Sequence, residues 1–117
     1  MCFILQRKRA KIAKSNIVCY KISNHLKYSK VEKYFRPHYF DKFKYILNKK
    51  TSKVCLSVLI DEISEGYHSY KDKNNQMVLW KKRTYKIGKF IIPKGTKYYE
   101  NETEYVSETL IFKGYIK

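Results

Sequence analysis

The stretch that most constrains the fold is residues 85–99, YKIGKFIIPKGTKYY, in which an apolar run meets a turn. The run stops at Pro93, and the segment from Pro93 to Gly95 suits a tight turn, because proline fixes φ and glycine tolerates positive φ. Residues 96–99 add β-branched and aromatic side chains, which favour an extended chain. We therefore predict a central strand, a tight corner and a returning strand, with the other strands packed around them.

The whole chain is predicted to form one small α+β domain, with a mainly antiparallel β-sheet and one or two short helices. Its 117 residues match the usual size of a single domain, and a hydrophobic content of 44% is enough for a modest core. Hydrophobic alternation predicts further strands, and a weaker pattern predicts a helix that Trp80 anchors to the sheet. The predicted strands are 16–22, 39–47, 53–60 and 105–112, with 39–47 and 53–60 paired as a hairpin, and the helix is 77–82.

The distribution of cysteines and histidines predicts no cofactor, metal site or disulfide framework. The cysteines are odd in number and lack a CxxC spacing, and the histidines have no metal-ligand spacing. The residues concerned are Cys2, Cys19, Cys55, His25, His38 and His68. No stretch approaches the roughly 20 apolar residues that cross a bilayer, and the first residues lack the order of a secretory signal. We therefore expect a cytoplasmic protein with no membrane partner.

The net charge of +16 is concentrated in the first half of the chain. Residues 1–60 hold 15 Lys and Arg against 2 acids, a balance of +13, and residues 61–117 hold 11 against 8, a balance of +3. Such a field attracts nucleic acid or an acidic protein surface. The alternative is a lysine-rich solvated surface with no dedicated partner.

Two segments of the basic half are candidate binding elements. The basic run at residues 6–14, within a candidate basic arm at residues 1–14, can neutralise phosphates and release their counterions. The alternative is a solvated leader before the first strand. The aromatic and basic residues 34–40 can stack bases and hold phosphates, or they form a hydrophobic cluster under a loop. The predicted binding residues are Arg7, Lys8, Arg9, Lys11, Lys14, Tyr34, Arg36, Lys42 and Lys44.

Two polar features lie within otherwise apolar strands. Lys21 falls on one face of the strand 16–22 with Ile17 and Cys19, which is typical of a snorkelling edge residue. Glu108 falls between apolar neighbours in 105–112, where a carboxylate needs a partner, and Lys21 is our candidate. His68 and Ser69 are adjacent, so on a strand they point to opposite faces and His68 does not activate Ser69.

The segments NIVCYKI, EGYHSY, IIPKGTKYY and YVSETLIF together resemble those of a group of short uncharacterised proteins from bacteria and their phages. Their order also resembles the ADP-ribosyltransferase fold, which has a basic residue on a first strand, a serine on a second and a glutamate on a later one. That resemblance implies an alternative site of Lys21, Ser69 and Glu108. The chain departs from the pattern, because Lys21 stands where arginine is usual and Val106 stands where Gln or Glu is usual.

We therefore expect a basic binding protein without enzymatic activity, which docks on RNA, on DNA or on a nucleic-acid-handling protein. The resemblance to phage proteins extends this to an inhibitor of a host defence nuclease, as in anti-CRISPR proteins, acting in the host cytoplasm. The alternatives are an ADP-ribosyltransferase-like enzyme or nucleotide binder, and a structural phage component. The oligomeric state is left open.

Overall fold

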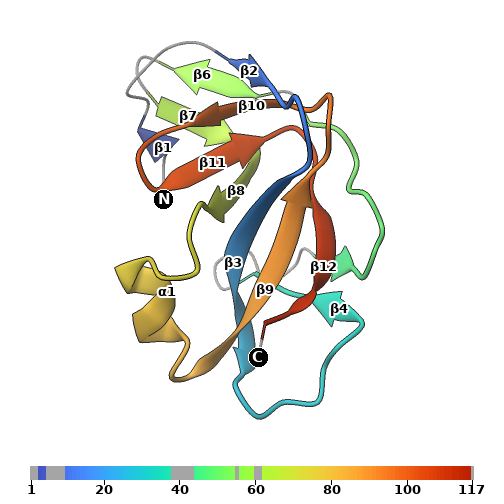
Figure 1. Cartoon of the computed structure of the whole chain (residues 1–117), viewed down its shortest axis with the longest axis vertical. Coiled ribbons are helices and arrows are strands. Elements are labelled where there is room, and N and C mark those ends of the chain that lie inside the picture. Colours follow the sequence, from blue (N-terminus) through green and yellow to red (C-terminus); the bar gives the residue numbers. More distant parts are fainter. Residues whose placement is uncertain (1–2, 5–9, 38–43, 55, 60–61, 117) are drawn as a thin grey trace.

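The chain is mostly antiparallel β-sheet with a short helix, in a computed structural model that describes residues 3–4, 10–37, 44–54, 56–59 and 62–116 (Figure 1). The larger sheet has seven strands in the order β12-β9-β3-β8-β11-β10-β2. These strands are β2 (Lys11–Ile12), β3 (Ile17–Leu26), β8 (Tyr67–Tyr70), β9 (Tyr85–Ile92), β10 (Lys97–Glu100), β11 (Glu104–Ser107) and β12 (Ile111–Tyr115). The predicted mainly antiparallel sheet is confirmed, and the helical share is smaller than an α+β domain usually has.

The corner predicted at Pro93–Gly95 is confirmed, and it separates two strands that are not neighbours. Gly95 has a φ of 87°, and the Thr96 N–H donates to the Pro93 carbonyl at 3.1 Å. Strand β9 pairs with β3 and β12, whereas β10 pairs with β11 and β2. The corner therefore takes the chain from β9, next to one edge strand of the sheet, to β10, next to the opposite edge strand.

One face of the sheet holds the largest buried cluster, which an aromatic side chain from outside this sheet completes. Strand β4 (Tyr34–Phe35) pairs with β5 (Tyr45–Ile46) and places the Phe35 ring fully inside. Its centroid lies 4.8 Å from that of Phe90 and 5.4 Å from that of Phe112. Gly88 makes this approach possible, because a Cβ there would lie 2.6 Å from the Phe35 ring.

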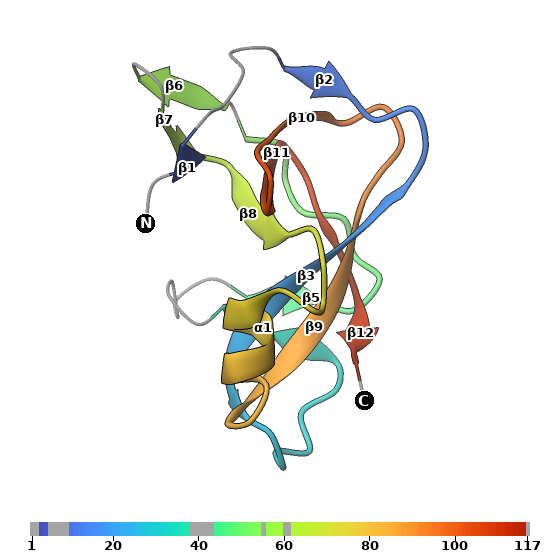
Figure 2. The same ribbon diagram turned by 60° about the vertical axis from the view of Figure 1, so that its left-hand side comes forward.

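The helix α1 (Gln76–Lys81) covers part of the opposite face (Figure 2). The Asn75 side chain caps its start by accepting from the Met77 N–H, which satisfies one of the free donors of the first turn. Val78 is fully buried and packs with Ile22 and Ile87. The helix prediction is confirmed, but the predicted anchor is wrong, because Val78 faces the sheet and Trp80 is exposed.

The predicted hairpin of 39–47 with 53–60 is wrong. Strand β6 (Ser57–Leu59) pairs with β7 (Glu62–Glu65), which also pairs with β1 (Phe3–Ile4), in a separate three-stranded sheet. Strand β5 pairs with β4 instead. Alternation identifies extended segments but not their partners. Strand β6 pairs with β7, which follows it almost immediately, because this pairing closes a shorter loop than pairing with residues 39–47 would. Residues 38–43 lie outside the described residues.

The predicted strand 105–112 is two strands, β11 and β12, separated at Glu108–Leu110. They occupy different places in the sheet order, so the chain must leave β11 and cross to the edge beside β9. The Ser107 hydroxyl donates to the Thr109 carbonyl at 3.0 Å, and the Thr96 and Thr109 hydroxyls lie 3.1 Å apart. These bonds satisfy polar groups at the crossing. No helix among the described residues is long and apolar enough to cross a membrane.

Candidate nucleic-acid interface

Aromatic rings and cations gather where the segment around β4 crosses the ends of β3, β9 and β12. The ring centroid of His25 lies 5.4 Å from that of Tyr34 and 6.4 Å from that of Tyr115. Ammonium groups lie over two of these rings: Lys44 Nζ is 4.8 Å from the Tyr34 centroid, and Lys86 Nζ is 4.9 Å from the Tyr115 centroid. We call this set the aromatic–basic cluster; it comprises His25, Tyr34, Arg36, Lys44, Lys86 and Tyr115.

Backbone pairing fixes the cluster to the sheet. The Asn24 N–H donates to the Arg36 carbonyl at 3.0 Å, and the Tyr115 hydroxyl donates to the Tyr34 carbonyl at 2.6 Å. Since side chains alternate along an extended segment, burying Phe35 turns Tyr34 and Arg36 away from the core, where both keep partial exposure. The ring that completes the core thus also orients two of the predicted binding residues.

The cluster has a positive electrostatic field. The pKa of His25 is lowered by burial first, and then by the nearby charges of Arg36 and Lys86. His25 is therefore neutral near pH 7, and its Nε2 is a buried atom without a hydrogen-bond partner. A neutral imidazole among cations leaves the positive charge to Arg36, Lys44 and Lys86.

Three of the predicted binding residues, Tyr34, Arg36 and Lys44, come together in this cluster. Lys14 is exposed between β2 and β3, away from the cluster, and the Lys11 ammonium is engaged by a carboxylate. Sequence reasoning missed His25, Lys86 and Tyr115 as members. These three residues are far from Tyr34 in the sequence, and only the pairing of β3, β9 and β12 brings them beside it, so no local pattern indicates them. The remaining predicted residues, Arg7, Lys8, Arg9 and Lys42, lie outside the described residues.

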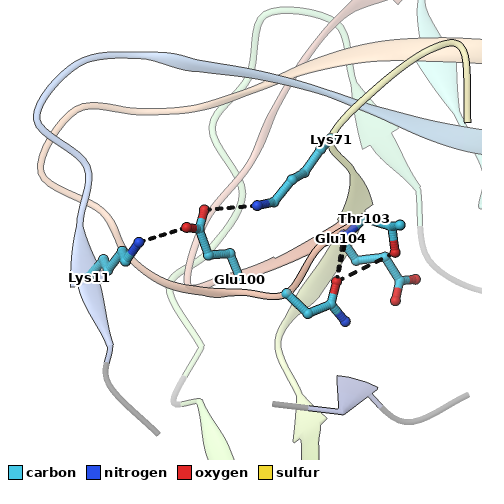
Figure 3. Close-up of polar contacts among 6 residues, drawn as sticks. Lys11, Lys71, Glu100, Thr103 and Glu104 are labelled. Carbon is cyan, nitrogen blue, oxygen red and sulfur yellow. Dashed lines mark hydrogen bonds and ion pairs between the residues drawn. The ribbon is translucent and has the colours of Figure 1, made fainter. Parts of the chain in front are cut away.

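Glu100 bridges two lysines at the opposite end of the sheet (Figure 3). Its carboxylate lies 2.6 Å from Lys11 Nζ and 3.2 Å from Lys71 Nζ. Burial acts to raise the pKa of this carboxyl, but the hydrogen bonds and the positive charges of Lys11 and Lys71 together outweigh burial and hold the pKa below its ordinary value. The bridge ties the edge strand β2 to β10 and to the end of β8.

Substituting Glu100 by glutamine should lower the free energy of unfolding at pH 7 by at most about 1 kcal/mol, because partly exposed ion pairs contribute little. Because the Glu100 pKa is lower in the folded state, its ionised carboxylate stabilises the fold at pH values above the unfolded-state pKa. This stabilisation is lost as the pH falls through the folded-state pKa. The difference between wild type and Glu100→Gln in urea denaturation should therefore shrink on acidification below about pH 4.5. A difference that grew in acid would contradict this assignment.

The residues of the alternative site are only partly brought together. Lys21 lies on β3 between β9 and β8, so its interpretation as an edge residue is wrong. Its ammonium donates to the His68 carbonyl, and burial lowers its pKa to about 8. Ser69, on the adjacent strand, is buried; its hydroxyl lies beside the Cys19 thiol and makes no hydrogen bond of ordinary geometry.

The predicted pairing of Lys21 with Glu108 is wrong. Glu108 lies just beyond β11, where its carboxylate accepts from the Lys97 N–H at 3.0 Å and lies 3.5 Å from Lys53 Nζ. The charged side chain whose field reaches Lys21 is Glu104, whose own pKa is raised by burial. The cause of the error is the break after β11, which removes Glu108 from the alternating pattern.

Comparison with family models, with curated proteins and with solved structures found no match for this chain. Among the described residues, no group of three or more His, Cys, Asp or Glu side chains is placed to hold a metal ion. The chemistry of the aromatic–basic cluster is therefore the observation on which a functional proposal can be based.

Proposed function

We propose that this protein is a small basic binding module that contacts single-stranded RNA or DNA through the aromatic–basic cluster. The observation that carries the proposal is the placement of Lys44 and Lys86 within 5 Å of the ring centroids of Tyr34 and Tyr115. The rings of Tyr34 and Tyr115 are partly exposed, and such rings can stack bases while neighbouring cations neutralise phosphates. Duplexes keep their bases stacked inside, so a surface of rings is better suited to a single strand.

The net charge of +16 supports the same partner, because it raises the local concentration of polyanions. None of the ion pairs within the described part of the chain involves Lys44 or Lys86, so their charge is available to a phosphate. Inhibition of a nucleic-acid-handling enzyme is one biological role such a module can serve. Docking on that enzyme itself is the competing mode, and the experiment below separates the two.

Neutralising the cluster cations should weaken binding and reduce its salt dependence. The binding constant K of a fluorescein-labelled oligonucleotide is measured by anisotropy between about 50 and 200 mM salt. Each cation lost should make the negative slope of log K against log salt shallower by about 0.7. Lys44→Gln and Lys86→Gln are the test variants. Lys94→Gln is the matched control, because this exposed lysine lies at the corner beyond the other end of β9.

The result that would overturn the proposal is an equal slope change in Lys94→Gln and the two cluster variants, since binding would then follow net charge alone. Absence of oligonucleotide binding, together with a protein partner that survives nuclease treatment of a lysate, would favour docking on a protein instead.

A further inference from the structure

A second set of aromatic and basic side chains lies at the same end of β3 and β9, on the helix side. Tyr28 is 88% exposed, Trp80 is 61% exposed and Leu26 is 62% exposed, which is unusual for side chains of this size. Exposed aromatic side chains grouped in this way indicate an interaction site. We call this set the α1 surface; it comprises Leu26, Lys27, Tyr28, Trp80, Lys81 and Tyr85.

Ring contacts and strand pairing connect the members of the α1 surface. Lys81 Nζ lies 4.4 Å from the Trp80 ring centroid and 5.8 Å from that of Tyr85. Tyr85 pairs with Leu26 across β9 and β3, and Lys27 Nζ lies 5.7 Å from the Tyr28 centroid. The surface therefore repeats the arrangement of the aromatic–basic cluster, with an ammonium over each of several rings.

The two surfaces lie back to back across the same pair of strands. His25 and Lys86 both contact the Tyr115 ring on one side of the sheet. Tyr85, the register partner of Leu26, lies near Lys81 of α1 on the other side. Figures 1 and 2 show α1 on one side of this end of β3 and β9, and β4 and β12 on the other. A single-stranded nucleic acid that leaves the aromatic–basic cluster would therefore reach the α1 surface by passing around the end of β3 and β9.

We infer that a single strand of RNA or DNA held at the aromatic–basic cluster continues around this end and stacks a base on Trp80. The inference rests on the proposed function and extends it to a second subsite. The cations Lys27 and Lys81 hold the phosphates on this side, which matches the charge of the ligand. Single-strand sites of about 4–16 nucleotides are usual, so one strand can serve both surfaces.

An anionic membrane is the competing occupant, since exposed Trp and Leu with neighbouring lysines also suit a lipid interface. A bilayer presents one plane, however, whereas the rings and cations here lie on both sides of β3 and β9. A flexible polymer that turns around the end fits this placement better than a flat surface does. We therefore assign the α1 surface to the same nucleic-acid strand.

Trp80 is the only tryptophan of the chain, so its fluorescence reports on this subsite directly. Titration with a 15-nucleotide oligothymidylate should quench the emission of Trp80 in the intact protein. In anisotropy measurements with the labelled oligonucleotide, Trp80→Ala should weaken binding by about tenfold, and Trp80→Phe should retain most of the affinity because it keeps a stacking ring. Leu79→Ala is the matched control, because Leu79 is exposed on the same helix and cannot stack a base.

The possible results are distinguishable. Unquenched emission with wild-type affinity in Trp80→Ala would overturn the second subsite and leave the proposed function standing. Absence of any oligonucleotide binding by the wild type would overturn both. A blue shift of Trp80 emission with vesicles of phosphatidylcholine and phosphatidylserine, but no quenching by the oligonucleotide, would assign the α1 surface to membrane instead.

Discussion

Replacing Phe35 with alanine is expected to lower the free energy of unfolding by about 3–5 kcal/mol, the usual cost of removing a fully buried phenylalanine. Its ring has no exposed area and lies 5.9 Å or less, centroid to centroid, from the rings of Tyr45, Phe90, Phe112 and Tyr115. The neighbours cannot readily close the cavity, because Gly88 is part of the sheet backbone beneath the ring. Strand β4 has only two residues, so Phe35 supplies most of the apolar packing of this segment, beside the hydrogen bonds at Tyr34 and Arg36.

Urea denaturation followed by circular dichroism measures this loss, with Tyr28→Ala as the control. Tyr28 is an aromatic side chain that is 88% exposed, so its removal should change stability by no more than about 0.5 kcal/mol. Phe35→Ala should also weaken oligonucleotide binding in conditions where the variant stays folded, because Tyr34 and Arg36 lose their support. A stability loss below about 1 kcal/mol would show that Phe35 does not carry the packing assigned to it.

The elements that sequence predicts well here are those with local signals. The corner at Pro93–Gly95 and the helix after Asn75 depend on residues that fix φ or cap an end within a few positions. The strand 16–22 was likewise found from its own alternation, and it extends to Leu26 in the structure. These turn, cap and alternation patterns depend only on neighbouring residues, so they can be predicted from a single sequence.

Strand pairing could not be predicted in the same way, because it depends on competition between distant segments. Alternation made 105–112 look continuous, although the chain breaks after Ser107 to cross from β11 to β12. The same limit applies to the candidate site. Tyr34 and Arg36 were found because they are neighbours in sequence, whereas Lys86 and Tyr115 join them only through the pairing of β9 with β12.

Lys21 is a charged group that the fold holds at an energetic cost, which its replacement by methionine should relieve. Burial lowers the pKa of Lys21 from the ordinary 10.5 to about 8, so the folded state resists its protonation. The cost is therefore complete below about pH 8 and disappears as the pH rises toward 10.5. The difference in pKa corresponds to at most about 3 kcal/mol, and methionine leaves the His68 carbonyl without its donor at a cost of about 1 kcal/mol.

We expect Lys21→Met to be more stable than wild type by about 1–2 kcal/mol at pH 7, and to lose this advantage by about pH 10. Both proteins should weaken in alkali, because burial raises the pKa of the Cys19 thiol to about 12 and also raises that of Tyr45, so these groups ionise first in the unfolded chain. The difference between the two proteins, measured by urea denaturation at both pH values, therefore reports Lys21 together with its electrostatic coupling to Cys19. Lys89→Met is the control, since Lys89 is an exposed lysine on the adjacent strand and its replacement should shift stability equally at the two pH values. A Lys21→Met variant that was less stable by the same amount at pH 7 and pH 10 would mean that the hydrogen bond to His68, and not the buried charge, sets the contribution of this residue.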